Sequence, residues 1–180
     1  MTFPRPRLNI IMPCSRRWNL PRLFEYYEKD MLPHSWEVRW LIGFAGPEPD
    51  EVGINKTNEL VGMVKYGWLF MMSDDCLHSP LLFRRLEETI EANPNAGAVV
   101  FGLTRFDGSF LDARPDHMVP GYIDASQTAW KKEFLGDDRY NKEAHGYCAD
   151  GHLAQRMYAK DPSRFVFVDE RLIAWNNLRP

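Results

Sequence analysis

The sequence predicts an α/β protein whose mainly parallel sheet is flanked by helices. Over about the first 100 residues, short apolar runs alternate with segments in which apolar residues recur at helical spacing. Residues 67–72 carry no charge, which is typical of a strand buried on both faces. This alternation of strands and helices implies right-handed crossovers between parallel strands.

Local signals place the elements of the first half. Pro13 stops the first strand, Pro21 stands near the start of the first helix, and Pro33 ends that helix. Ser79 followed by Pro80 is a helix start signal. Strands are expected at residues 8–12, 38–44, 67–72 and 98–102, and helices at residues 20–31, 56–65 and 79–93.

The second half is less regular. The pair Asp107-Gly108 predicts a hairpin turn between residues 103–106 and 109–111. Further on, we expect an open loop at residues 114–120, strands at residues 122–124 and 165–168, and a helix at residues 149–160. No repeat or linker interrupts the chain, so residues 1–180 are expected to form a single compact domain.

Composition restricts the classes of function. The formal net charge is −3, so no basic surplus suggests a nucleic-acid or membrane-surface partner. The apolar run after the basic N-terminus is too short for a signal peptide, and no segment approaches the roughly 20 apolar residues of a membrane span. The three cysteines lack paired zinc-type spacing and fit a reducing compartment. A cytoplasmic location is expected.

The most informative feature is a pair of acids at the end of the uncharged run. Asp74 and Asp75 follow residues 67–72, and ligands bind at strand ends in α/β sheets. Two adjacent carboxylates repel and are costly to bury unpaired, and a hard divalent cation such as Mg²⁺ or Mn²⁺ relieves that cost. A solvated turn that caps the next helix explains the same residues without a ligand.

Four motifs follow one another along the chain: LNIIMPCSR at residues 8–16, GWLFMMSDDC at residues 67–76, YIDASQ at residues 122–127, and Ala149-Asp150. Their order resembles the family 2 glycosyltransferases, which have a GT-A fold. Residues 8–16 (LNIIMPCSR) look like the family's first strand and its proline-ended loop, and residues 67–76 (GWLFMMSDDC), followed by Pro80, resemble its metal-binding strand. Residues 122–127 (YIDASQ) are similar to a later segment of such enzymes. Ala149-Asp150, at the head of a helix, falls where the family carries its catalytic acid.

The resemblance implies a division of roles. Asp150 would be the general base and Asp75, with or without Asp74, would hold Mn²⁺ or Mg²⁺. His145 and His152 bracket Asp150 and are further candidates for a metal ligand or a hydrogen-bond donor to the diphosphate, although a lone surface histidine at a loop or helix start is the commoner case. Candidates for donor binding are Pro13, Cys14, Ser15, Arg16, Phe44 and Ser73, and candidates for acceptor binding are Asp124 and Trp18. Asp124 could instead satisfy backbone groups at a strand end.

The sequence also departs from the family pattern. The metal motif usually reads Asp-any-Asp, whereas Ser73 stands in the first position here, so Asp75 matches the family's ligand and Asp74 fills the variable position. The acid that often follows the second strand is absent from residues 43–46. The diphosphate is therefore expected near residues 13–17 and 73–75, with the nucleobase held by residues 43–45.

Together these features predict a metal-dependent transfer of a sugar from a nucleotide-diphosphate sugar to a carbohydrate or other hydroxyl acceptor, and the resemblance implies that the transfer is inverting. Such transfer needs cationic groups at the leaving diphosphate and a base at the acceptor hydroxyl. Two alternatives remain open. One is a nucleotidyltransferase, although residues 13–17 have no glycine; the other is a non-catalytic nucleotide-sugar-binding module of the same fold.

Overall fold

The computed structural model describes residues 6–28, 32, 35–44, 52–140, 148–174 and 178. The strands are β1 (Arg7–Cys14), β2 (Glu37–Phe44), β3 (Trp68–Met71), β4 (Leu77–His78), β5 (Ala98–Thr104), β6 (Phe110–Leu111), β7 (Thr128–Lys131) and β8 (Phe165–Ala174). The α-helices are α1 (Leu20–Glu28), α2 (Val52–Met63), α3 (Leu82–Ala92), α4 (Lys132–Leu135) and α5 (Ala149–Lys160). Short 3-10 turns lie at Arg17–Asn19, Pro115–His117, Ala125–Gln127 and Pro162–Arg164.

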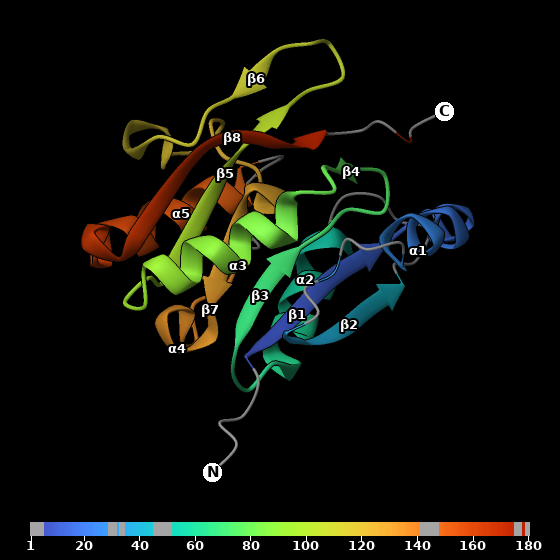
Figure 1. The fold of residues 1–180 in the computed structure, drawn as a ribbon, viewed down its shortest axis with the longest axis horizontal. Helices are drawn as coiled ribbons and strands as arrows, with labels where there is room; N and C mark the ends of the chain where they lie inside the picture. The colour runs from blue at the N-terminus through green and yellow to red at the C-terminus, as the bar shows by residue number, and fades with distance from the viewer. Residues whose placement is uncertain are drawn as a thin grey trace.

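The described strands form an eight-stranded mixed sheet in the order β2-β1-β3-β7-β5-β8-β4, with β6 paired to β5 (Figure 1). β1 pairs in parallel with β2 and β3, and β5 pairs in parallel with β8. β7 lies between β3 and β5 and is antiparallel to both. The carboxyl ends of β1, β2 and β3 therefore meet at one edge of the sheet, where the acid pair follows β3.

Helices cover both faces of the sheet, and α3 crosses the face turned to the viewer in Figure 1. Alternate strand residues explain why both faces are buried. Ile10 and Phe70 pack with residues of α1 and α3 on one face, whereas Ile11 and Leu69 pack with residues of α2 and α5 on the other. The period-two alternation of a strand divides these apolar side chains between two cores.

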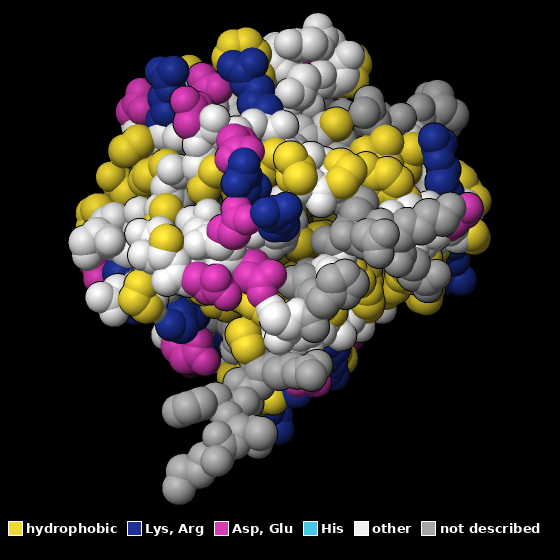
Figure 2. Space-filling view, in the orientation of Figure 1, with side chains coloured by type: hydrophobic (Ala, Val, Ile, Leu, Met, Phe, Trp, Pro, Cys, Tyr) yellow, Lys and Arg dark blue, Asp and Glu magenta, His cyan; other side chains and the backbone are white. Residues whose placement is uncertain are grey.

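The surface over α3 is polar, as expected for a helix with one buried stripe. Figure 2 shows basic side chains (Lys or Arg) interspersed with acidic ones in the middle of the visible face. Arg85 accounts for part of this pattern, because it pairs with Glu88 on its own helix and with Glu170 on β8. These partly exposed pairs contribute little stability. No helix in the described ranges is long and apolar enough to cross a membrane.

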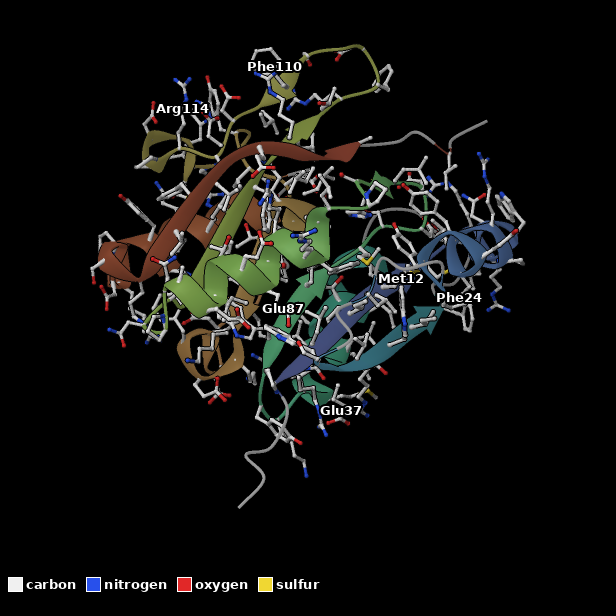
Figure 3. All side chains as sticks on the ribbon, viewed as in Figure 1. Met12, Phe24, Glu37, Glu87, Phe110 and Arg114 are labelled. Carbon is white, nitrogen blue, oxygen red and sulfur yellow. The ribbon has the colours of Figure 1, made fainter. Side chains whose placement is uncertain are left out.

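Most predicted elements are present, with shifted ends. The helix expected at residues 149–160 is α5, and the hairpin expected around Asp107-Gly108 joins β5 to β6. β1 continues through Pro13, and α3 begins at Leu82, after the Ser79 hydroxyl accepts a hydrogen bond from Leu81 N–H at 3.2 Å. Phe110, labelled in Figure 3, lies on β6 at the top of the view and is half exposed.

The strand predicted at residues 122–124 is wrong. Asp124 caps the 3-10 turn Ala125–Gln127: its Oδ1 accepts from Ser126 N–H at 2.8 Å, and Gln127 Oε1 accepts from Asp124 N–H at 2.9 Å. A short carboxylate that bonds the local backbone favours a cap over a strand. The strand that follows this turn is β7, which begins at Thr128. Neither β7 nor the two-residue strand β4 was predicted.

Candidate active site

The acid pair lies at the carboxyl end of β3, beside the loop that follows β1. Met72 N–H donates to Ile11 O at 2.9 Å, which continues the β1–β3 ladder to the edge of the sheet. Asp74 and Asp75 then leave the sheet with exposed fractions of only 2% and 3%. Buried carboxylates need partners, so their contacts define what this edge can do.

Asp74 holds the loop after β1. Its Oδ2 accepts from the backbone N–H groups of Ser15, at 2.7 Å, and of Arg16, and its Oδ1 accepts from Arg16 Nη1 at 2.9 Å. Its carbonyl oxygen accepts from Asn19 Nδ2 at 2.9 Å. Asp74 is thus an anchor that fixes residues 15–19 against the end of β3.

Asp75 contacts the same arginine as Asp74. Its Oδ2 lies 3.2 Å from Arg16 Nη1, and its Oδ1 accepts a 3.5 Å hydrogen bond from the Cys76 thiol. Its carbonyl oxygen accepts from Leu178 N–H at 2.9 Å, so Leu178 lies against this edge of the sheet. The same guanidinium nitrogen therefore bridges both acids.

The two carboxylates offer the hard oxygen donors that Mg²⁺ and Mn²⁺ prefer. In the described ranges, no three His, Cys, Asp or Glu side chains are grouped as a complete protein ligand set. A cation held by these two described carboxylates alone would keep coordination positions open to water or to a bound ligand.

A second pair of acids, Asp124 and Asp150, lies where α5 meets the turn after residue 124. Asp150 stands in the first turn of α5, with its Oδ1 accepting from Gly151 N–H at 2.9 Å and its Oδ2 accepting from Ala125 N–H at 3.0 Å. Burial, with the charge of Asp124 as the next cause, raises the pKa of Asp150 to about 7. This carboxyl can accept or release a proton near neutral pH.

The two acid pairs are electrostatically connected. Burial raises the pKa of Asp124, its hydrogen bonds with Ser126 oppose that shift, and the charge of Asp75 raises it further. Asp75 is thus near enough to Asp124 to influence it, and Asp124 in turn influences Asp150. We call Asp74, Asp75, Asp124 and Asp150 the carboxylate row.

A cavity of about 340 Å³ opens at the Asp150 end of the carboxylate row. The β5–β6 hairpin forms its opposite wall with Arg105, Phe106 and Asp107. Phe106 is 70% exposed and lines this cavity together with the carboxylates Asp124 and Asp150. An exposed aromatic ring next to acidic acceptors is an arrangement that suits a sugar, which presents apolar C–H faces and hydroxyl donors.

The start of α5 is packed tightly enough to hold Asp150 in place. A Cβ on Gly151 would lie 2.4 Å from Pro120 Cα and 2.9 Å from Val119 O, so only glycine allows the helix this close to residues 119–120. Tyr140 and Asp150 line the same small pocket. Tyr140 is held by two 2.9 Å hydrogen bonds with Asn58, from Tyr140 N–H to Asn58 Oδ1 and from Asn58 Nδ2 to Tyr140 O. Burial raises the pKa of the Tyr140 hydroxyl, which stays protonated.

The predicted donor residues fall on both sides of Asp74. Ser15 is exposed, Pro13, Arg16 and Ser73 are half-buried, and all four lie at the shared edge of β1 and β3. Cys14 is fully buried, and burial, with the nearby Asp74 charge as the next cause, raises the pKa of its thiol to about 11. Its side chain therefore packs as a neutral thiol and offers a ligand only its backbone.

The remaining predicted site residues do not line the cavity or lie outside the described residues. Phe44, at the end of β2, is 46% exposed, and the Arg17 guanidinium carbon lies 4.2 Å from its ring centroid. Trp18, next to Arg17 in the 3-10 turn after β1, is 70% exposed and does not line the cavity. His152 lies on α5, half-buried, and is likewise outside that lining. His145 lies outside the described residues.

Sequence reasoning missed the hairpin wall of the cavity. Arg105 and Phe106 were assigned to a hairpin but to no site, because the sequence does not show that this hairpin stands over α5. The available signal was the turn itself, since Asp107-Gly108 forces the preceding aromatic residue to the exposed tip.

No protein-family model matches the sequence, and no curated protein matches it in sequence. Solved structures match it in fold. S. aureus TarS (residues 1–349) has a TM-score of 0.61 at 11% identity, with 93% of this chain and 60% of TarS covered. The mannosyltransferase PcManGT from Pyrobaculum calidifontis, in complex with GDP-Man and Mn²⁺, has a TM-score of 0.64 at 12% identity, with 97% and 58% covered.

A third similar structure is A197 from STIV, with a TM-score of 0.53 at 12% identity and coverage of 97% of this chain and 83% of that one. TarS is also solved with UDP-GlcNAc, in a structure with a TM-score of 0.58. The chain spans less than two thirds of the length of TarS and PcManGT. Its mixed sheet flanked by helices is a GT-A-like glycosyltransferase fold.

Proposed function

We propose that this protein is a metal-dependent, inverting glycosyltransferase that moves a sugar from a nucleotide-diphosphate sugar to an acceptor hydroxyl, with residues 1–180 acting as one compact catalytic unit. The observation that carries the proposal is the carboxylate row, which runs from a cation-suited pair after β3 to an acid with a pKa of about 7 at a cavity. The GT-A-like fold supports it, since two matching structures hold GDP-Man with Mn²⁺ and UDP-GlcNAc.

The donor half of the site is the loop held by Asp74. Ser15, Arg16 and Arg17 follow β1 at the edge where nucleotides bind in open α/β sheets. The diphosphate would lie across residues 13–17 and 73–75, with the nucleobase near Phe44. Arg16 supplies a guanidinium, the group best suited to two phosphate oxygens.

Asp75 is the proposed cation ligand, because Asp74 is engaged by two backbone N–H groups and Arg16. A bound Mn²⁺ or Mg²⁺ supplies positive charge to the leaving diphosphate. Asp75 positions that charge at the end of β3, and burial of its side chain strengthens the interaction by excluding water.

Asp150 is the proposed general base. An ionised Asp150 takes the proton from the acceptor hydroxyl as the oxygen attacks the anomeric carbon, and the bond to the diphosphate breaks on the opposite face. A base whose pKa lies near the working pH combines a useful ionised fraction with a strong affinity for the proton. The cavity beside it would take the acceptor, with Phe106 as a stacking surface and Asp124 as a hydroxyl acceptor.

A non-catalytic nucleotide-sugar-binding module is the second candidate. Ser73 in the first position of the acid motif and the bridging of both acids by Arg16 favour it, because each reduces the charge offered to a cation. In that case the chain would bind donor and leave it intact.

A panel of UDP-, GDP- and dTDP-sugars, assayed for binding by calorimetry and for hydrolysis with and without Mn²⁺, tests the proposal. We expect one donor class to bind and to be hydrolysed only with Mn²⁺, and transfer to give the product anomer opposite to the donor's, as read by NMR. Binding without turnover would favour the module. Release of pyrophosphate in a separate reaction supplied with a nucleoside triphosphate and a sugar 1-phosphate would indicate a nucleotidyltransferase. A panel in which no donor binds would refute all three.

A further inference from the structure

Arg16 lies where a cation shared by the two adjacent carboxylates would lie. Its Nη1 is 2.9 Å from Asp74 Oδ1 and 3.2 Å from Asp75 Oδ2. The side chains of the two acids are 3% and 4% exposed, whereas the Arg16 side chain is 24% exposed. The guanidinium can therefore move toward solvent on its flexible stem, while the acids are fixed at the end of β3.

The charges at this point favour one cation at a time. The guanidinium offsets one of the two negative charges of the acid pair, and a divalent cation at Asp75 would add two positive charges within a few ångströms of it. Like charges so close repel strongly where water is largely excluded. A nucleoside diphosphate reverses this balance, because its oxygens can bind the guanidinium in a bidentate manner and also coordinate the cation.

We propose that Arg16 is a built-in counter-ion that keeps a divalent cation off Asp75 until a nucleoside diphosphate binds and draws the guanidinium to its phosphates. The inference rests on the proposed function for the identity of the ligand. Cation and nucleotide then bind cooperatively, and thermodynamic linkage requires each to raise the affinity of the other by the same factor. Arg16 sets the size of that factor.

The test measures Mn²⁺ binding in the absence of nucleotide. Arg16→Met removes the charge, and Arg16→Gln removes the charge but keeps an N–H donor for Asp74. Both variants should bind Mn²⁺ at least about tenfold more tightly than the wild type, the scale of one charge interaction at a partly buried site. Arg84→Met is the matched control, because Arg84 is exposed on α3 and pairs with Glu88 there, and the Mn²⁺ affinity of this variant should equal that of the wild type.

The readouts are the free Mn²⁺ signal in electron paramagnetic resonance and the rise in Tm on adding Mn²⁺. The Tm measurement also works for a destabilised variant, because a ligand stabilises the native state that it binds. Adding UDP or GDP should then tighten Mn²⁺ binding in the wild type by a larger factor than in Arg16→Gln. Unchanged Mn²⁺ affinity in both Arg16 variants, or an equal gain in Arg84→Met, would overturn the counter-ion role.

This outcome is separable from the proposed function. If donor turnover is found but Mn²⁺ binds the Arg16 variants and the wild type alike, glycosyl transfer stands and the counter-ion role fails. If no nucleotide sugar binds while the Arg16 variants gain Mn²⁺ affinity, Arg16 does exclude the cation and the glycosyltransferase proposal fails.

Discussion

The raised pKa of Asp150 gives the transfer rate a specific pH dependence. Only the ionised carboxylate can accept the proton of the acceptor hydroxyl, so the rate should follow the ionised fraction of Asp150. With a pKa of about 7, that fraction falls about tenfold between pH 8 and pH 6. An aspartate with the ordinary value of 3.8 would change by less than about 1% over the same range.

The assay is kcat for sugar transfer at saturating donor and Mn²⁺, measured from pH 5 to pH 9. We expect a single ionisation with a midpoint near 7. Asp124→Asn should move the midpoint to lower pH, because it removes a nearby negative charge, but burial is the larger cause and stays in place. Asp116→Asn, at an exposed acid, is the control. A flat profile from pH 6 to pH 8 would refute the assignment of Asp150.

The same shift affects stability with a defined sign. The folded chain binds a proton at Asp150 more tightly than the unfolded chain does, because the pKa is raised above the ordinary value of 3.8 to about 7. Asp150 therefore lowers the free energy of unfolding as pH rises from about 4 to about 7. Asp150→Asn should lose that part of the pH dependence in urea titrations at pH 5 and pH 8.

The other predictions concern the acid pair and the packing of α5. Asp75→Ala should abolish Mn²⁺-dependent donor binding in calorimetry while its urea midpoint stays near that of the wild type; undiminished binding would show that the cation lies elsewhere. Asp74→Ala removes the acceptor of the hydrogen bonds from the Ser15 and Arg16 N–H groups, and it should lower the free energy of unfolding by about 1–3 kcal/mol. Gly151→Ala should cost about 1–3 kcal/mol through the 2.4 Å clash with Pro120. Gly62→Ala, with nothing within 4 Å of its added Cβ, should instead stabilise α2 by about 0.5–1 kcal/mol, and equal effects of the two substitutions would contradict the packing argument.

The first half of the fold could be predicted because its signals are local. Apolar periodicity identified the strands β1, β2, β3 and β5, and proline and serine signals identified the helices between them. The antiparallel insertion of β7 between β3 and β5 could not be predicted. Its four residues, Thr128–Lys131, owe their place to partners distant in the sequence on both sides.

The candidate site divides in the same way. Asp75 could be proposed because it is an acid at the end of a strand, and Asp150 because it lies at the start of a helix in a segment that resembles the family 2 glycosyltransferases. The role of Asp74 as a loop anchor could not, because it depends on backbone N–H groups that approach it from β1. Asp124 was assigned to a strand because its neighbours are apolar or aromatic, whereas its side chain captures the local backbone as a cap.

The central claim is that the donor site and the base are separate ends of one carboxylate row, and Asp150→Asn tests it most directly. Donor affinity and transfer rate are measured on the same preparation of the variant and the wild type, at pH 8 with Mn²⁺. We predict that the donor Kd stays within about twofold of the wild type while transfer falls by about 10²- to 10⁴-fold, the range for loss of a general base. Transfer at a near wild-type rate, or loss of donor binding, would contradict the account.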